Sequence, residues 1–142
     1  MSEYANHEVI DRIKALLPGF AERAQETEEL RKVHPQNIAE LDEAGFFKLC
    51  QPSQWGGYEA DMETFYTAAM LVATACPSTG WCASILGIHN WHLALFPQKA
   101  QKEVWGRGPD RAYLVVVRPD GCGQEDRRRA GSQRQVVLVL GL

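Results

Sequence analysis

Residues 61–96, DMETFYTAAMLVATACPSTGWCASILGIHNWHLALF, decide the fold of this chain. Apolar and small residues recur in this stretch at helical spacing rather than in strict alternation, which predicts α-helix on both sides of Pro77. Asp61 is a good N-cap for the first helix, METFYTAAMLVATA, whose alanine-rich, apolar composition predicts burial on most sides. Ser78 or Thr79 is expected to cap the second helix, which carries GWCASILGIHNWHLALF.

Two histidines of the second helix, His89 and His92, are the first candidates for chemistry. They are three residues apart, so on a helix they project together. A metal site is disfavoured, because the pair has no carboxylate of the kind that helical metal motifs use. Two interpretations stay open: core histidines, or polar contacts in an apolar pocket that hold a substrate oxygen or exchange a proton with it. Trp81 and Trp91 are also at helical spacing, which is more often typical of core residues than of cofactor contacts.

The sequence around this stretch also predicts helices joined by turns. Residues 7–31 have apolar side chains at helical spacing, with an interruption or kink near Pro18. A second helix is expected to begin at Pro35 and to end at Gly45, followed by a turn-rich loop, QPSQWGGYEAD. Pro97 is expected to start a last short helix. The predicted fold class is therefore all-α.

Composition limits the classes of function. The chain has 142 residues, 45% of them hydrophobic, and a formal net charge of −3. These values fit a single domain with a core and give no reason to expect nucleic acid or a membrane surface as partner. No signal peptide is visible, and the longest apolar run, AAMLVATAC, is about half the roughly 20 residues that span a bilayer. None of the four cysteines forms a C-x-x-C pair, so Cys76 and Cys82 are expected to be reduced, structural residues in a cytoplasmic protein.

From Arg111 onward the sequence changes in kind. Six arginines and no lysine follow Asp110, whereas all five lysines lie before Arg107. Two apolar clusters in this tail flank a polar, glycine-rich stretch. These features are typical of a β-hairpin or of a disordered basic tail.

Three segments, read in order, resemble one family: LDEAGFFKLCQPSQWGGYEAD, the alanine-rich helix, and STGWCASILGIHNWHLALFPQKAQKEVWG. They are similar to the oxygenase components of two-component, reduced-flavin-dependent aromatic monooxygenases with the acyl-CoA dehydrogenase fold. STGW followed by HNWHLALF is specific to this branch, whereas QPSQWGG is shared more loosely across acyl-CoA dehydrogenases. The steroid-catabolic members, which hydroxylate 3-hydroxy-9,10-secoandrosta-1,3,5(10)-triene-9,17-dione, are the nearest in motif. The resemblance covers about residues 9–110.

The resemblance implies a fold and its boundaries. Members have an N-terminal helical domain, a central β-domain and a C-terminal four-helix bundle that drives formation of a homotetramer. Residues 1–110 are therefore expected to be an N-terminal helical domain of the acyl-CoA dehydrogenase fold, and residues 111–142 an irregular tail without homology to the family. Intact members are much longer than this chain.

The resemblance also implies a chemistry. A separate flavin reductase supplies reduced FMN or FAD, and a phenolic substrate is hydroxylated with O2, ortho to its hydroxyl group. The flavin carries out the difficult step, while the protein supplies orientation, electrostatics and exclusion of water. By the HNWH motif, His89 is expected to contact the phenol or accept its proton, and His92 to be a substrate-binding neighbour. Trp81 of STGW resembles a residue beside the flavin, and Ser84, one turn further, is expected to face the same pocket.

A shift of reading frame explains the tail. After residue 110 the family continues with a strand of the type ARISSSYAP, which is absent in frame. The segment RAYLVVVRPD, which begins at Arg111, can be encoded so that dropping the first base gives Ala-Arg-Thr-Ser-Ser-Ser-Tyr-Ala-Pro. The same shift continued through the tail restores a later family motif that ends in Ser-Ser-Gly-Cys. We interpret residues 111–142 as out of frame.

Two other functions stay open at this stage. The chain could be the N-terminal part of a true acyl-CoA dehydrogenase, which oxidises a CoA thioester with FAD, although HNWH in place of an acyl-chain tunnel argues against it. It could also be a non-catalytic helical binding domain with a basic arm, which salt-dependent nucleic-acid binding lost on deletion of residues 111–142 would reveal. Because the rest of the scaffold is absent, the pocket is open to water, and we expect the chain alone to lack useful hydroxylase activity.

Overall fold

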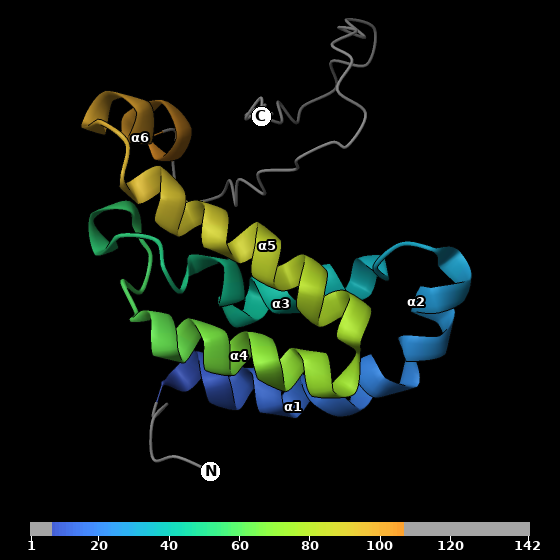
Figure 1. Cartoon of the computed structure of the whole chain (residues 1–142). Coiled ribbons are helices and arrows are strands. Elements are labelled where there is room, and N and C mark those ends of the chain that lie inside the picture. Colours follow the sequence, from blue (N-terminus) through green and yellow to red (C-terminus); the bar gives the residue numbers. More distant parts are fainter. Residues whose placement is uncertain (1–6, 107–142) are drawn as a thin grey trace, which may run out of the picture.

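A computed structural model of the chain describes residues 7–106 (Figure 1). In that range all regular structure is helical, in six α-helices and two short 3-10 helices. The all-α prediction is therefore confirmed over these residues. The predicted boundary at residue 110 and the predicted tail, residues 111–142, lie outside the described residues.

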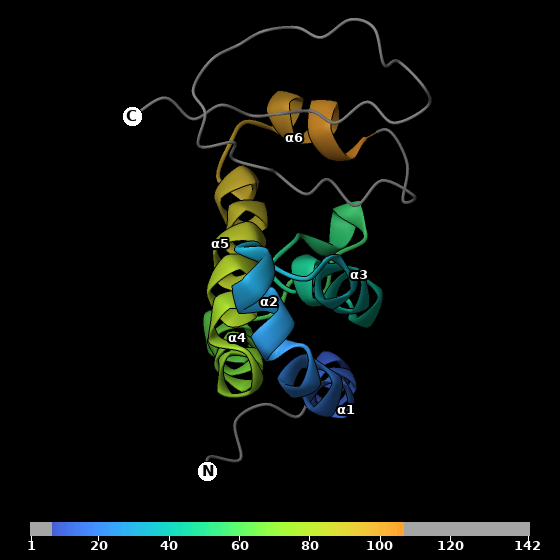
Figure 2. The same cartoon turned by 90° about the vertical axis from the view of Figure 1, so that its right-hand side faces the viewer.

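The two helices on either side of Pro77 form one layer of the domain. These are α4, Met62–Ala75, and α5, Pro77–Ala94, which pack along each other. Figure 2 shows them on one side of the molecule, with α1 and α3 on the other. The predicted cap of α4 is confirmed, because Asp61 Oδ1 accepts a hydrogen bond from the Thr64 amide at 2.7 Å.

Helix α4 is covered on the sides that face α1 and α5, as predicted, and is exposed along one remaining side. Phe65 and Val72 are buried, but Tyr66 and Met70 are 54% and 61% exposed. Within the described residues, α4 packs mainly against α1 and α5, and its Phe65 ring also contacts Phe46 of η1. The apolar composition of α4 predicted burial, but it did not predict how many other helices are present to cover it.

The predicted cap of α5 is wrong. The N-cap residue is Cys76, and it makes no side-chain cap hydrogen bond. The Thr79 hydroxyl accepts a hydrogen bond from Asn37 Nδ2 at 2.9 Å and donates one to Cys76 Sγ, while the Ser78 hydroxyl donates to Glu28. Both hydroxyls are therefore engaged by neighbouring groups rather than by the free amides of their own helix.

The first predicted helix is divided, but not at the proline. Helix α1, Glu8–Glu22, continues through Pro18, and the break occurs at Arg23, before α2, Ala24–Leu30. Arg23 Nε donates to Asn37 Oδ1 at 2.6 Å, and its guanidinium pairs with Glu40 at 2.5 Å. The predicted interruption near Pro18 is thus wrong, and the chain turns at Arg23 because the contacts of Arg23 to α3 fix that position.

Helix α3 begins and ends as predicted. It spans Pro35–Ala44 and stops at Gly45, whose φ of 92° favours glycine. A Cβ at this position would lie 2.9 Å from the ring of Tyr58, so glycine is also required for space. Two 3-10 turns follow, η1 at Phe46–Lys48 and η2 at Ser53–Trp55, and they lead into α4.

The main core lies between the two layers. It is built from aliphatic and aromatic side chains of α1, α3, η1, α4 and α5, among them Val9, Ile13, Phe20, Leu41, Phe46, Phe65 and Val72. Gly87 brings α5 close to this core, because a Cβ there would lie 2.7 Å from the ring of Phe65. The phenylalanine rings of η1 and α4 therefore pack directly on the backbone of α5.

The last helix, α6, spans Gln98–Trp105 and follows Pro97 as predicted. Gln101 joins it to α5: its Nε2 donates to the carbonyl oxygens of Ala94 and Phe96, and its Oε1 accepts from the Trp55 indole. The C-terminal end of α5 is therefore held by both α6 and the η2 turn. No helix in residues 7–106 is long and apolar enough to cross a membrane.

Candidate functional site

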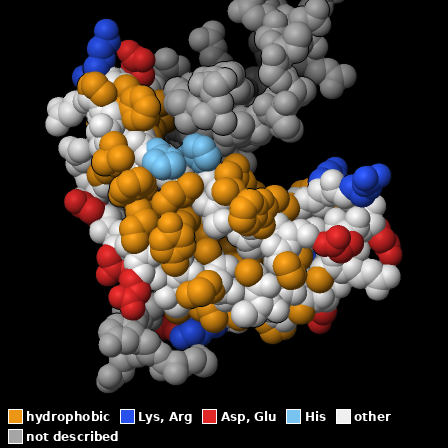
Figure 3. All heavy atoms as spheres, viewed as in Figure 1, with side chains coloured by type: hydrophobic (Ala, Val, Ile, Leu, Met, Phe, Trp, Pro, Cys, Tyr) orange, Lys and Arg blue, Asp and Glu red, His pale blue; other side chains and the backbone are white. Residues whose placement is uncertain are grey.

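Helices α4 and α5 present an exposed apolar surface on the side away from α1. In Figure 3, hydrophobic side chains gather over both helices on this side. Residues 64–98 contain no Asp, Glu, Lys or Arg, so neither α5 nor α4 after Glu63 contributes a carboxylate, an ammonium or a guanidinium group to this surface. We call it the α4–α5 face and define it by its most exposed side chains: Tyr66, Met70, Trp81, Ile85 and Leu95.

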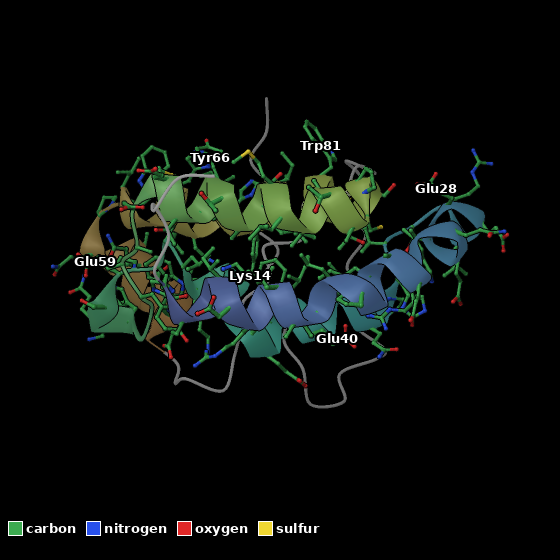
Figure 4. All side chains as sticks on the ribbon, turned by 90° about the horizontal axis from the view of Figure 1, so that it is seen from below. Lys14, Glu28, Glu40, Glu59, Tyr66 and Trp81 are labelled. Carbon is green, nitrogen blue, oxygen red and sulfur yellow. The ribbon has the colours of Figure 1, made fainter. Side chains whose placement is uncertain are left out.

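Tyr66 and Trp81 show the orientation of this face. Both side chains point to the same side of the molecule, opposite to α1, as Figure 4 shows. The Trp81 side chain is 70% exposed. A large apolar ring that is this exposed is not a core residue, so one of the two interpretations of Trp81 is removed.

His89 and His92 form a pair near the end of α5. Their ring centroids are 5.7 Å apart and the rings meet edge to face. His92 is exposed and also packs against Trp91, whereas His89 is half-buried. The structure therefore brings the two predicted histidines together and places neither of them in the core.

The His89 ring has a defined tautomer. Its Nδ1 lies in hydrogen-bond contact with the carbonyl oxygen of Ile85, one turn earlier in α5. Because a carbonyl oxygen only accepts, Nδ1 carries the hydrogen in the neutral ring. Nε2 is then left with a free lone pair, which is the form of imidazole that can accept a proton.

An apolar hollow of about 420 Å³ adjoins the histidine pair. His92, Leu95, Phe96 and Pro97 line it, at the turn between α5 and α6. The lining is apolar apart from the imidazole of His92. A hollow of this kind suits an aromatic or aliphatic ring with one polar substituent.

Ser84 does not join the histidine site. Its hydroxyl donates to the Trp81 carbonyl at 2.7 Å, back along its own helix. Five residues separate Ser84 from His89, which places the two side chains about 140° apart around a helix. Eight residues separate Trp81 from His89, so these two are about 80° apart around the helix and roughly 12 Å apart along its axis.

The cysteines of α5 and its neighbours have the properties of structural residues. Cys50 and Cys76 are buried and Cys82 is half-buried. Burial raises the pKa of Cys50 to about 11 and also raises the pKa of Cys82, which disfavours the reactive thiolate. Within residues 7–106, no group of three or more His, Cys, Asp or Glu side chains is arranged to hold a metal ion.

Asn90, between the two histidines, is a site-positioning residue that the sequence analysis missed. It is buried, and its Nδ2 donates to the carbonyl oxygen of Phe47 at 2.5 Å. This bond ties the histidine-bearing turn of α5 to η1. The available signal was an amide residue in an otherwise apolar run, since a buried amide needs a partner.

The fold has a match among known protein families. The model of the acyl-CoA dehydrogenase N-terminal domain matches residues 7–108. The chain belongs to this family. The match covers all of the described residues and includes every candidate site residue.

Several relatives of this family member are hydroxylases. The chain is 53% identical over 115 residues to the oxygenase subunit HsaA of a flavin-dependent monooxygenase from Rhodococcus jostii. These 115 residues make up 81% of this chain and 30% of the relative. It is 36% identical over 102 residues to the oxygenase component of an FADH2-dependent resorcinol hydroxylase from Rhizobium. These 102 residues make up 72% of this chain and 25% of that protein. The chain thus spans about a third or less of the length of these relatives.

A solved structure agrees in fold. The crystal structure of 3-HSA hydroxylase from Rhodococcus sp. RHA1 superposes with a TM-score of 0.70 at 58% identity, over 72% of this chain and 26% of that one. The resemblance to oxygenase components of flavin-dependent aromatic monooxygenases is therefore confirmed. The relatives named here are monooxygenases or hydroxylases, which favours that branch over a true acyl-CoA dehydrogenase.

Proposed function

We propose that this chain supplies the helical N-terminal part of a flavin-dependent oxygenase that hydroxylates a phenolic ring ortho to its hydroxyl group. The substrate that is hydroxylated is a phenol of the secosteroid class or another aromatic compound of similar size. A partner flavin reductase delivers the reduced flavin. The observation that carries the proposal is the edge-to-face pair of imidazoles: the Ile85 carbonyl holds Nδ1 of His89 and leaves Nε2 as the acceptor, and its neighbour His92 lines an apolar hollow. The names of the relatives support the reaction class.

His89 accepts the proton of the substrate hydroxyl. The Ile85 carbonyl holds the hydrogen on Nδ1, so Nε2 is free to accept a hydrogen bond from a phenol and then its proton. Removal of that proton increases the electron density of the ring carbon ortho to the oxygen, which is the carbon that receives the new hydroxyl group. The protonated ring keeps its hydrogen bond to Ile85, which stabilises the imidazolium.

We assign His92 to binding of the aromatic substrate, and not to acceptance of its proton. It lines the apolar hollow together with Leu95 and Phe96, and its ring contacts the edge of His89. Its side chain is exposed, so its position depends on what covers the α4–α5 face. We assign it to orientation of the aromatic substrate.

The residues present fit one side of a reduced flavin. When bound, FMN or FAD supplies the activation of O2. The exposed indole of Trp81 offers an apolar plane for a fused ring system. We also propose Ser84 as a contact of the flavin, which requires its hydroxyl to exchange the bond to the Trp81 carbonyl for one to the flavin.

The chain alone is expected to be inactive. It spans about 30% of the HsaA relative, and its α4–α5 face is open. An open site admits water, which weakens electrostatic interactions and allows unproductive breakdown of reactive species. The complete protein is proposed to be a cytoplasmic homotetramer in which the remaining domains close the site. Phenol hydroxylation by the purified chain with reductase, NADH and O2 would contradict this expectation.

A chimera tests the proposed function directly. Residues 1–106 replace the matching segment of the Rhodococcus jostii oxygenase subunit, and hydroxylation of a phenolic substrate is measured with the reductase. We expect an active chimera. A chimera that folds and binds reduced flavin but hydroxylates no phenol would overturn the proposal.

Substitutions in the chimera separate the roles of the histidines. His89→Gln is expected to lower kcat by about 100-fold and to remove the acid limb of the pH–rate profile. His92→Gln is expected to raise KM with a smaller effect on kcat. His34→Gln, at the start of α3, is the matched control and should change neither parameter. An unchanged pH–rate profile in His89→Gln would show that His89 is not the base.

A further inference from the structure

The histidine pair of α5 has the side chains that bind transition-metal ions. The ring centroids of His89 and His92 are 5.7 Å apart, and both rings reach the surface, His92 more than His89. Imidazole is the commonest ligand of borderline divalent ions such as Ni²⁺, Zn²⁺ and Cu²⁺. The lack of a carboxylate beside the pair argues against a resident catalytic metal, but two imidazoles and water are enough to hold an exchangeable ion.

The hydrogen bond of His89 is the kind that metal-binding histidines make. Its Nδ1 donates to the carbonyl oxygen of Ile85, which fixes the tautomer and leaves the lone pair on Nε2. A histidine that binds a metal through one nitrogen almost always donates its other N–H to a carbonyl or a carboxylate, and this bond makes the binding nitrogen more basic. His89 therefore has the tautomer of a metal ligand before any ion binds.

The separation of the two rings fits a shared ion. An ion about 2.1 Å from an imidazole nitrogen lies about 3.2 Å from the centroid of that ring, so two rings on one tetrahedral ion have centroids about 5.2 Å apart. The observed separation of 5.7 Å is slightly larger. Because His92 is exposed and the terminal torsion of a histidine is broad, rotation of this ring closes the difference.

The surroundings of the pair neither repel a cation nor supply a third protein ligand. Residues 64–98 contain no lysine or arginine, so α4 and α5 place no positive charge beside the imidazoles. Within residues 7–106, no third His, Cys, Asp or Glu side chain joins them. Water then completes the coordination, as it does at exchangeable sites with few protein ligands.

We propose that His89 and His92 together bind one divalent ion of the Ni²⁺ and Zn²⁺ class through one nitrogen of each ring. The ion occupies the Nε2 lone pair of His89, which the proposed function uses for the substrate hydroxyl. Metal binding and proton acceptance at His89 are then mutually exclusive. This consequence rests on the proposed function, whereas the metal site itself does not.

Ni²⁺ is the probe, because it prefers imidazole ligands and is paramagnetic. The untagged, isotope-labelled 142-residue chain is titrated with Ni²⁺ and followed by NMR and calorimetry. We expect one ion per chain and strong broadening of the Trp91 indole signal, because this ring packs against His92. Trp81 lines a second hollow, of about 310 Å³, near the other end of α5. Its indole signal should stay sharp, because ten residues of helix separate it from Trp91, about 15 Å along the axis.

Single substitutions test whether both rings bind the same ion. His89→Gln and His92→Gln should each weaken Ni²⁺ binding by about tenfold or more, because two ligands on one helix bind as an intramolecular pair. His7→Asn combined with His34→Asn is the matched control. It removes the other two histidines of the chain and keeps a capping side chain at the start of α1 and α3. Unchanged affinity in either single variant, or loss of binding in the control, would overturn the site.

Urea unfolding gives a second measurement that does not depend on the NMR signals. An ion that binds only the folded helix raises the unfolding midpoint of the unmodified chain. His92 is exposed, so His92→Gln should have the same midpoint as the unmodified chain without metal. The rise on addition of Ni²⁺ should disappear in this variant, and EDTA should reverse it in the unmodified chain. An equal rise in His92→Gln would place the ion elsewhere.

These measurements separate the metal site from the proposed function. They use no flavin, reductase or phenol, so an inactive chimera together with Ni²⁺ binding at the pair would overturn the proposed function and support the metal site. The absence of Ni²⁺ binding, with an active chimera, would overturn the metal site and leave the role of His89 as proton acceptor in place.

Discussion

The chemistry available at His89 depends on a single hydrogen bond to a backbone carbonyl. The carbonyl oxygen of Ile85 fixes the hydrogen on Nδ1, and this leaves Nε2 as an acceptor. His92 has no comparable bond among the described residues, although it is on the same helix and nearby. We therefore propose different roles for these two identical side chains, because only one of them has a backbone partner that fixes its tautomer.

The hydrogen bonds of a single residue, Asp61, predict that the free energy of unfolding depends on pH. Hydrogen bonds from Thr64 lower the pKa of the Asp61 carboxyl below its ordinary value. The stabilisation is therefore present in full above the unfolded-state pKa of about 4 and is lost as the pH falls through the lower, folded-state value. Asp61→Asn keeps a capping side chain without the charge, so its stability should fall less than that of the unmodified chain on acidification.

Urea unfolding at neutral pH and at pH values below the unfolded-state pKa of Asp61 measures this difference. Glu22→Gln, which removes an exposed carboxylate at the end of α1, is the control and should follow the unmodified chain. Equal losses of stability in Asp61→Asn and in the unmodified chain would show that the cap does not contribute through its charge.

Substitution of Gly87 by alanine is predicted to destabilise the chain, although helix propensity alone predicts that it stabilises. Glycine to alanine within a helix normally stabilises by up to about 1 kcal/mol. Here the new Cβ would meet the ring of Phe65 at 2.7 Å and that of Phe46 at 3.0 Å. We expect Gly87→Ala to destabilise the chain by about 1–3 kcal/mol in urea unfolding. Ser84→Ala, on the outer side of α5, is the control; a stabilised Gly87→Ala would contradict the close packing.

At the scale of single residues, the sequence predicted local features well and distant partners poorly. The Asp61 cap and the Gly45 stop depend on neighbours in the sequence, and both were predicted. The roles of Thr79 and Asn90 depend on Asn37 and on the Phe47 carbonyl, which lie far away in the chain. The position of Trp81 outside the core likewise depends on which segments are present to cover it.

At the scale of helices, the α4–α5 face is the main unsatisfied feature of the fold. The two helices bury one side against α1 and the core and leave an uncharged, aromatic side exposed. The pattern of apolar residues predicted both helices with their ends nearly correct. It did not predict the break at Arg23, because that break follows from contacts with α3.

The exposed face predicts self-association of the isolated chain. Exposed apolar patches of this kind favour contacts with other apolar surfaces. Tyr66→Lys combined with Met70→Lys places charge on the face without touching the buried side of α4. We expect the double substitution to lower the weight-average mass in sedimentation velocity and to reduce binding of a hydrophobic dye. Gln25→Lys with Glu29→Gln, on the exposed side of α2, changes the net charge by the same two units and is the control; equal changes in both variants would assign the effect to net charge.

At the scale of the whole molecule, the described residues form one helical domain with two hollows at the two ends of α5. The histidines are near its C-terminal end and Trp81 is near its N-terminal end, on a helix of 18 residues. A ligand that contacted both ends would therefore extend along this helix. The family match over residues 7–108 places this domain at the start of much longer relatives.

The frame-shift interpretation of residues 111–142 is tested at the level of the gene. We expect the DNA read across codon 110 and beyond to encode, in a shifted frame, Ala-Arg-Thr-Ser-Ser-Ser-Tyr-Ala-Pro and then a strand ending in Ser-Ser-Gly-Cys. Resequencing of this region, together with mass spectrometry of the native product, checks the expectation. Tryptic peptides of the printed tail and no homology in either shifted frame would contradict it.

The bonds made by Gln101 have a consequence for chemical ageing of the protein. Its amide nitrogen donates to two carbonyl oxygens, those of Ala94 and Phe96, while its oxygen accepts from Trp55. Deamidation would replace that nitrogen by an oxygen, and a carboxylate facing two carbonyl groups is repelled by both. The loss of one amide would then detach α6 from the end of α5, so slow hydrolysis at this side chain would disorganise the histidine end of the domain before the core is affected.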